Sequence, residues 1–313
     1  MIKSAFLTIS SMVLSIGLCI APSKPMAKQT EPMQESTSAK LNKVADVLNN
    51  QTNLTPAEQA RFLLRKVYLT GKVGGELPEL DPELEKRVGQ KCLISRDQLR
   101  AYLERNHIAD WEVGGNIDLP LSSVTDAKGN QNFAKYMVIH DTSYPRYESS
   151  FPKNIDDESW EWNHLNRWVA NVTHIFVNRI GDSKTMNPFH EGVTATKLER
   201  FVLGEGATKG LYLHIELIQP RKSMKGYGRH NDVDAPTPGF TTPQYKRLAQ
   251  LYTIAAVRKG EYLIPGFHAC VDSGIKYAHD DPQNFDLPKF FAALNEVWKE
   301  IERPISNSRV GSE

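Results

Sequence analysis

The stretch LYLHIELI, residues 211–218, has the alternating pattern of a β-strand. Successive side chains of a strand point to opposite faces, so every second residue shares a face. One face carries the aliphatic residues Leu211, Leu213, Ile215 and Leu217. The other face carries Tyr212, His214 and Glu216. A glutamate within such an apolar strand is costly unless it has a partner or a role, and the alternative is that this face is solvated.

Further strands and helices extend outward from this stretch. Residues 136–140 (YMVIH) and 173–177 (THIFV) are short runs rich in β-branched and aromatic residues, which are typical of strands. Helical spacing of apolar residues predicts helices over 159–171, from Thr242 to a stop at Gly260, and after Pro288. Strands that alternate with helices predict an α/β domain over residues 111–303, followed by a tail over 304–313.

The segments before residue 111 have a different character. Residues 28–54 are polar and predict a flexible linker. Capping boxes begin at Thr55 and at Ser95, and apolar residues follow each of them at helical spacing. Residues 55–110 therefore predict a helical N-terminal region, in which we find no catalytic chemistry.

The extreme N-terminus predicts export. One lysine precedes AFLTISSMVLSIGLCIA, residues 5–21, an uncharged run of 17 residues. A basic start, an apolar run and nearby small residues are typical of a cleaved signal peptide, here residues 1–27. The alternative is a membrane anchor, although this run is at the short end for a membrane span. The mature chain is then expected to be periplasmic or secreted, without a transmembrane segment.

Charge and cysteine content narrow the partners. The chain of 313 residues has 38 basic and 37 acidic side chains and a net charge of +1, which argues against nucleic acid as a partner. After removal of the signal peptide, Cys92 and Cys270 would remain in an oxidising compartment. They could form a disulfide or stay as unpaired thiols.

Histidines at strand ends suggest a metal site. The chain has no GxSxG motif, and His190-Glu191 does not continue as HExxH because Thr194 stands at the fifth position. His140 ends one strand, and His268 follows Ile264-Pro265-Gly266-Phe267, a dozen residues before a run of carboxylates. Imidazole and carboxylate are ligands that zinc prefers, whereas a lone histidine in such a place is more often structural.

Six segments carry a resemblance to a known family: YMVIHDTS, THIFVNRIGD, FHEG, LYLHIELI, FTTPQYKRLAQLY and IPGFHACVDSGIKYAHDDPQNFD. In this order they resemble the zinc-dependent N-acetylmuramoyl-L-alanine amidases of the type 2 amidase and peptidoglycan recognition protein family. The resemblance covers about residues 136–291. It implies a central mixed β-sheet flanked by helices and one zinc ion (Zn²⁺) per chain.

The resemblance also assigns the metal ligands. His140 and His268 match the two histidine ligands, and Lys276 has the spacing of a catalytic lysine in cytoplasmic members of the family. The third ligand, an aspartate followed by proline, matches Asp281, although an insertion before Pro282 leaves His279 as an alternative. Cys270 is a further, weaker ligand candidate.

Glu216 matches the glutamate that acts as the base in the bacterial branch of the family. His190 resembles a histidine that lines the substrate groove, and His174 matches one in the central strand that binds substrate or only packs and forms hydrogen bonds. The implied function is cleavage, by zinc-activated water, of the amide between N-acetylmuramic acid and L-alanine in peptidoglycan. The alternatives are a non-catalytic peptidoglycan receptor of the same fold, or another exported zinc hydrolase such as a deacetylase.

Overall fold

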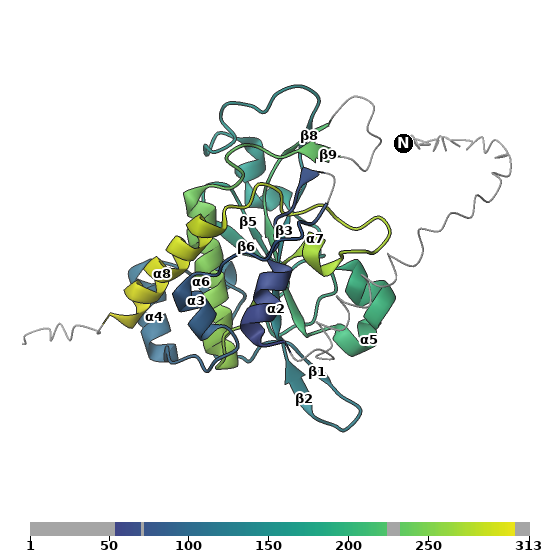
Figure 1. Cartoon of the computed structure of the whole chain (residues 1–313). Coiled ribbons are helices and arrows are strands. Elements are labelled where there is room, and N and C mark those ends of the chain that lie inside the picture. Colours follow the sequence, from purple (N-terminus) through teal and green to yellow (C-terminus); the bar gives the residue numbers. More distant parts are fainter. Residues whose placement is uncertain (1–53, 70–71, 224–231, 304–313) are drawn as a thin grey trace, which may run out of the picture.

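The computed structural model describes residues 54–69, 72–223 and 232–303 (Figure 1). The predicted signal peptide, nearly all of the predicted linker and the C-terminal tail lie outside the described residues. Within the described residues, no helix combines the length and the apolar character that a membrane crossing requires.

A mixed five-stranded sheet forms the centre of the molecule. Its order is β10 (Ile264–Phe267), β3 (Tyr136–Asp141), β7 (Tyr212–Leu217), β5 (Ile175–Val177) and β6 (Ser183–Thr185). The first four strands in this order are parallel, and β6 is antiparallel to β5. The α/β class, the mixed sheet and three strands named from the sequence are thus confirmed.

Helices and two smaller sheets surround this sheet. The α-helices are α2 (Pro56–Leu63), α3 (Pro82–Arg87), α4 (Arg96–Arg105), α5 (Glu205–Thr208), α6 (Thr242–Lys259), α7 (His268–Val271) and α8 (Leu287–Glu302). The shorter elements are the 3-10 helices η2 (Asp110–Glu112), η3 (Glu161–Asn163) and η4 (Leu165–Arg167) and the π-helix η5 (Leu198–Leu203). The smaller sheets are β1 (Ser123–Thr125) with β2 (Gln131–Phe133), and β4 (Arg146–Tyr147) with β8 (Arg221–Ser223) and β9 (Asp232–Asp234).

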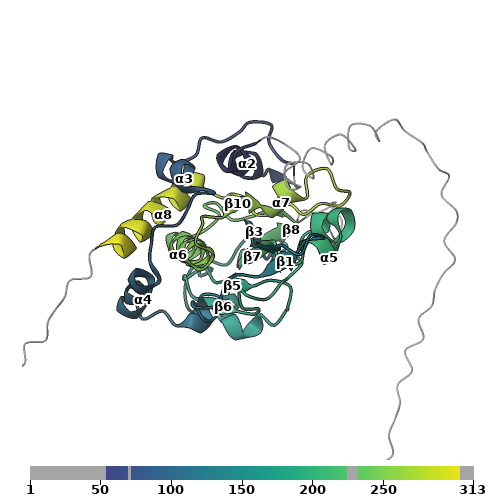
Figure 2. The same cartoon turned by 90° about the horizontal axis from the view of Figure 1, so that it is seen from below.

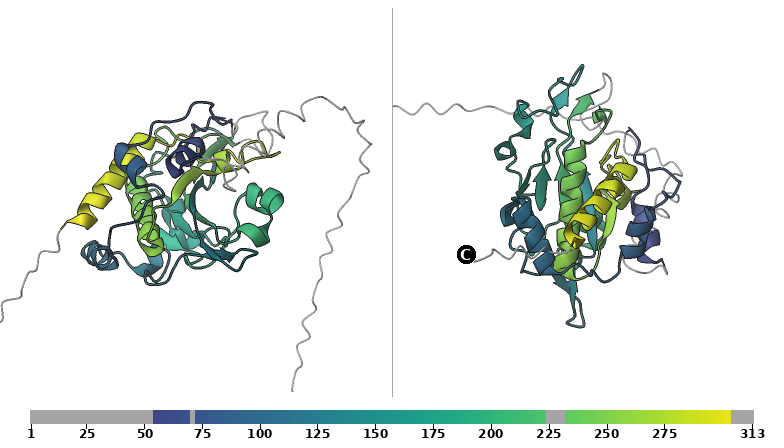
Figure 3. Two further views of the ribbon diagram at one scale, coloured as in Figure 1. Left: turned by 60° about the horizontal axis from the view of Figure 1, so that its bottom comes forward. Right: turned by 90° about the vertical axis from the view of Figure 1, so that its left-hand side faces the viewer.

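Viewed along the strands, α6 and α8 lie on one side of the sheet, and α5 and the β1–β2 hairpin on the other (Figure 2). Helices α6 and α8 lie side by side over the sheet (Figure 3, right). The predicted ends of α6 are observed: Thr241 caps its N-terminus, and Gly260 ends it in the left-handed conformation with φ of 79°.

The N-terminal helices share the core of the α/β domain. Both predicted capping boxes form, at Thr55 and Ser95. Helix α2 packs directly on β10, where a Cβ at Gly266 would come within 2.9 Å of Leu63 Cβ. Leu84 of α3 and Leu99 of α4 belong to the same hydrophobic cluster as the sheet and α8. Residues 55–110 therefore brace the domain that carries the strands.

The predicted helix over residues 159–171 is wrong. Only η3 and η4 form there. Asn163 is buried, and its side-chain amide donates hydrogen bonds to the carbonyls of Ile155 and Asp157. Trp160 packs with Ile155 and Ile218 in a small separate cluster. These tertiary contacts replace the repeating hydrogen bonds of a helix.

Candidate metal centre

Two adjacent parallel strands bring His140 and His268 together. Strand β3 ends near His140, β10 ends at Phe267, and Phe267 lies in register with Ile139. Parallel strands end at the same edge of a sheet, so residues that follow them meet there. His140 Nδ1 lies 2.8 Å from His268 Nδ1, and both rings are buried.

Asp281 completes a group of three. Its Oδ2 lies 3.2 Å from His268 Nδ1 and 3.7 Å from His140 Nδ1. The carboxylate is buried, and the main-chain amide of Asp141 donates to the same oxygen. The Asp281 carbonyl accepts a hydrogen bond from the Ala269 amide, which ties this segment to α7. His140, His268 and Asp281 could therefore hold a metal ion.

His279, the alternative third ligand, lies at the rim. Its side chain is 55% exposed, and its Nδ1 is 3.6 Å from Asp281 Oδ1. Its ring stacks on that of His268 with centroids 4.4 Å apart. Asp281 therefore occupies the interior position that a ligand needs, and His279 covers it from outside.

The distances within the group suit zinc. Bonds of about 2.0–2.1 Å at tetrahedral angles place ligand atoms roughly 3.3 Å apart. The three donor pairs measured above lie between 2.8 and 3.7 Å. Two unprotonated ring nitrogens repel each other at 2.8 Å, so a proton or a metal ion has to lie between them. The donor set therefore fits a cation, and two imidazoles with one carboxylate are typical zinc ligands.

Neighbouring charges shift the pKa values of these groups. Burial lowers the pKa of His140, and the adjacent His268 lowers it further. Burial also opposes the charged form of His268, but Asp281 and Asp272 outweigh it and raise its pKa well above the ordinary value. Burial opposes ionisation of Asp281, yet His268 keeps the pKa of this carboxyl below its usual range.

Glu216 lies beside the group from the neighbouring strand. It is in register with His140 across β3 and β7, and its Oε1 is 3.9 Å from His140 Nδ1. Its Oε2 is buried and has no hydrogen-bond partner among the described residues. Burial, and then the charge of Asp281, raise the pKa of Glu216 well above its ordinary value. Because His214 and Tyr212 on the same face are also buried, the solvated-face alternative is wrong.

Lys276 and His190 are not brought into this group. Lys276 is exposed, and its ammonium lies over the Tyr277 ring, 5.0 Å from the centroid. In the described part of the chain it forms no ion pair with Glu216 or Asp281. His190 is exposed in the turn after Phe189 and forms no hydrogen bond or ion pair with the group among the described residues.

His174, predicted to bind substrate or only to pack and form hydrogen bonds, has a fully buried ring. Its Nδ1 accepts a hydrogen bond from the His214 amide, and its Nε2 donates one to the Glu191 carbonyl. Both nitrogens are thus occupied by the main chain. These contacts favour the packing and hydrogen-bonding alternative for this residue.

The Cys92–Cys270 disulfide is wrong, because both cysteines are buried free thiols. The Cys92 amide bonds to Gly260, which precedes β10, whereas Cys270 follows that strand. The four residues of β10 separate the two ends, and each strand residue adds about 3.3 Å. Cys270 Sγ donates to the Arg65 carbonyl, 3.4 Å away, so its sulfur is engaged away from the group.

Two supporting carboxylates were not anticipated from the sequence. Asp272 Oδ2 lies 3.0 Å from His268 Nε2, the nitrogen that faces away from the group. Asp141 forms a buried ion pair with Arg221, with 2.7 Å between Oδ2 and the guanidinium. His268 and Asp272 are four residues apart at the start of a helix, and this spacing would have identified Asp272 from the sequence.

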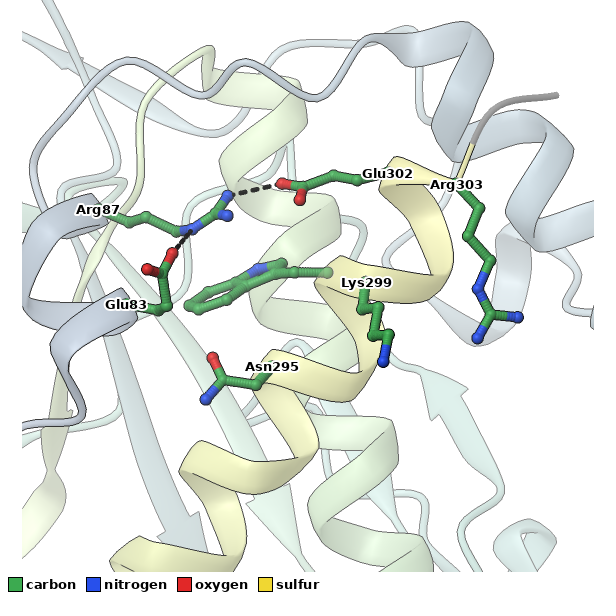
Figure 4. Close-up of a pocket in the computed structure, with 7 residues that line it drawn as sticks. Glu83, Arg87, Asn295, Lys299, Glu302 and Arg303 are labelled. Carbon is green, nitrogen blue, oxygen red and sulfur yellow. Dashed lines mark hydrogen bonds and ion pairs between the residues drawn. The ribbon is translucent and has the colours of Figure 1, made fainter.

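Two hollows among the described residues lie away from this group. One of about 360 Å³ lies between α3 and α8 and is lined by Glu83, Arg87, Trp298, Glu302 and neighbouring residues of α8 (Figure 4). None of His140, His268 and Asp281 lines it.

No protein-family model, no curated protein and no solved structure matches this chain. The class of site is therefore defined by geometry alone: a buried group of two histidines and an aspartate that could hold a metal ion, with a buried glutamate beside it.

Proposed function

We propose that this protein is an exported zinc hydrolase that cleaves the amide bond between N-acetylmuramic acid and L-alanine in peptidoglycan. The observation that carries the proposal is the approach of His140, His268 and Asp281 at one sheet edge, with Glu216 beside them. The substrate comes from the resemblance of the segments around these residues to N-acetylmuramoyl-L-alanine amidases.

His140 and His268, through Nδ1, and Asp281, through Oδ2, would hold the zinc ion. Hydrolysis of an amide is slow because water is a weak nucleophile and the amide carbonyl is a weak electrophile. When bound, zinc lowers the pKa of water and polarises the carbonyl, and so acts on both obstacles. Three protein ligands are the number typical of catalytic zinc sites.

Glu216 would act as the general base. Its Oε1 is 3.9 Å from His140 Nδ1, close enough to accept a hydrogen bond from a water molecule beside that nitrogen. It would take the proton of this water and pass it to the leaving amine of L-alanine. A pKa above the ordinary value makes its carboxylate a stronger proton acceptor, and its buried position keeps that carboxylate poorly solvated.

A catalytic lysine at this place would stabilise the oxyanion that forms when water attacks the amide carbonyl. Lys276 is instead exposed and contacts Tyr277, so we assign it no such role. The proposed mechanism therefore rests on the three metal-binding side chains and Glu216, and it requires no serine or cysteine nucleophile.

The mass of the products tests the proposal. The purified full chain, loaded with one equivalent of zinc, is incubated with muropeptides that carry an intact lactyl-L-alanine amide. We expect a free peptide with L-alanine at its N-terminus and a peptide-free sugar. Loss of an acetyl group instead would identify a deacetylase. Binding of muropeptides without any change in mass would identify a receptor and contradict an enzymatic function.

A further inference from the structure

We propose that His214 and Glu199 are positioning residues that fix the tautomer of His140, so that its Nδ1 lone pair faces the metal-binding group. This inference rests on the proposed zinc site, and it concerns the groups that prepare this site. It assigns a role to two fully buried polar side chains that the proposed mechanism does not use.

A chain of three side chains leads away from the group. His140 Nε2 lies 3.0 Å from His214 Nδ1. On the far side of that ring, His214 Nε2 lies 3.3 Å from Glu199 Oε2. The exposed fractions are 1% for His140 and 0% for both His214 and Glu199, so water cannot replace any of these partners. The second contact falls short of hydrogen-bond geometry, so the carboxylate acts on His214 through its charge.

Glu199, at the far end of this row of side chains, determines which nitrogen of the His214 ring carries the proton. Glu199 Oε2 accepts hydrogen bonds from the Thr196 amide at 3.0 Å and the Thr196 hydroxyl at 2.8 Å. Burial opposes ionisation of Glu199, but His214 and these bonds outweigh it, and the pKa of the carboxyl lies below its ordinary value. A carboxylate beside His214 Nε2 favours the tautomer with the proton on that nitrogen.

The position of the proton on His214 then determines the position of the proton on His140. With its proton on Nε2, His214 presents an unprotonated Nδ1, which can only accept a hydrogen bond. His140 then has to donate from Nε2, which leaves its Nδ1 unprotonated. This is the nitrogen that lies 2.8 Å from His268 Nδ1 and 3.7 Å from Asp281 Oδ2. Glu199 and His214 thus prepare His140 as a metal ligand before any metal ion binds.

Asp272 orients the ring of His268 in a similar way, because its Oδ2 accepts from His268 Nε2, and without a metal ion the proton between the two Nδ1 atoms lies on His268. One short segment holds both Glu199 and Asp272. The amides of Ala195 and Thr196 donate to Glu199, and those of Lys197 and Leu198 donate to Asp272. Residues 195–198 therefore orient both histidines at once, by consecutive main-chain groups.

A pair of variants at position 214 separates positioning from packing. Leucine and asparagine have similar size and shape, but only asparagine keeps an acceptor near the place of His214 Nδ1. We expect His214→Leu to weaken zinc binding by about 10–100-fold, and His214→Asn to weaken it less than tenfold. The measurement is competition for zinc against a chromophoric chelator, with the full chain.

The tautomer itself is observed in the metal-free protein. With ¹⁵N-labelled histidine, the ring nitrogens of wild-type His140 should show the proton on Nε2, and His214→Leu should show a mixture of both tautomers. Glu199→Gln provides the same test in case His214→Leu does not fold, as judged by thermal unfolding. An unchanged tautomer with unchanged zinc affinity, in whichever of these variants folds, would overturn the inference.

Failure of the proposed zinc site and failure of the positioning role give different results. If the wild-type chain bound no zinc, the proposed function would fail, but the His140 tautomer in the metal-free chain would still test the positioning role. If wild-type bound zinc and the variants matched it, only the positioning role would fail.

Discussion

The group at the ends of β3 and β10 and the hollow between α3 and α8 both gather opposite charges beside aromatic rings. In the hollow, Arg87 lies over the Trp298 ring and pairs with Glu302 at 2.8 Å (Figure 4). The Arg87 and Glu302 side chains are 21% and 41% exposed, whereas those of His140 and Asp281 are 2% and 3% exposed.

This difference shows which charges need an explanation. Exposed ion pairs are worth about 0–1 kcal/mol, and water solvates either partner when the other is lost. Buried charges lose that solvation and are costly unless they are paired or bind a cation. The hollow is a cavity of about 360 Å³ with partly exposed charges, whereas the buried group holds the polar atoms that could bind a metal ion. Substitutions in the two regions test this contrast.

Asp281→Ala should remove the zinc. We expect the metal content to fall from about one ion per chain to nearly none, because two histidines alone seldom hold zinc in a protein. Peptide release should fall to the background. His279→Ala is the matched control, with zinc retained because this side chain lies at the rim. Metal analysis after dialysis distinguishes them, and the reverse pattern would show that His279 is the ligand.

Glu216→Gln should leave zinc bound and lower kcat by about 10²–10⁴-fold, since the amide cannot accept a proton from water. Gln has nearly the same shape, so the buried environment is kept. Steady-state kinetics with a muropeptide and metal analysis are measured on the same sample. Loss of zinc in this variant would instead indicate that Glu216 is a ligand.

Lys276→Ala should change kcat by no more than about threefold, a loss well below that of a group that stabilises an oxyanion. The reason is its position, exposed and over Tyr277. The kinetic assay used for Glu216→Gln provides the comparison. A loss of 100-fold or more would show that this turn moves toward the group when substrate binds.

Glu302→Gln in the α3–α8 hollow should leave zinc content and kcat unchanged and lower stability by about 0–1 kcal/mol. The ion pair with Arg87 is partly exposed, so water screens it. Thermal unfolding and the peptide-release assay are the two measurements. Any effect on zinc binding would break the contrast between the two regions.

The pattern of residues 211–218 predicted much of this arrangement. Alternation placed His214 and Glu216 on one face, and the strand ends predicted that His140 and His268 carry the chemistry. These features depend on local periodicity, which the sequence displays directly.

The supporting groups could not be predicted, because they depend on which loop covers that face. Glu199 resembles an exposed charge in LERFVL but is fully buried against His214. Lys276 has the spacing of a catalytic lysine in the family that the sequence resembles, yet its turn, with Tyr277 at φ of 61°, leaves the side chain exposed. A spacing along the chain does not determine the direction of a side chain on a loop.

Peptide release as a function of added zinc is the decisive measurement of zinc-dependent hydrolysis by this protein. Metal-free protein is titrated with zinc in the presence of a muropeptide, and the peptide with N-terminal L-alanine is quantified. We expect no release without zinc and a rise that saturates at one equivalent per chain. Release that is independent of zinc, or no release at any zinc concentration, would show that this site is not a zinc amidase centre.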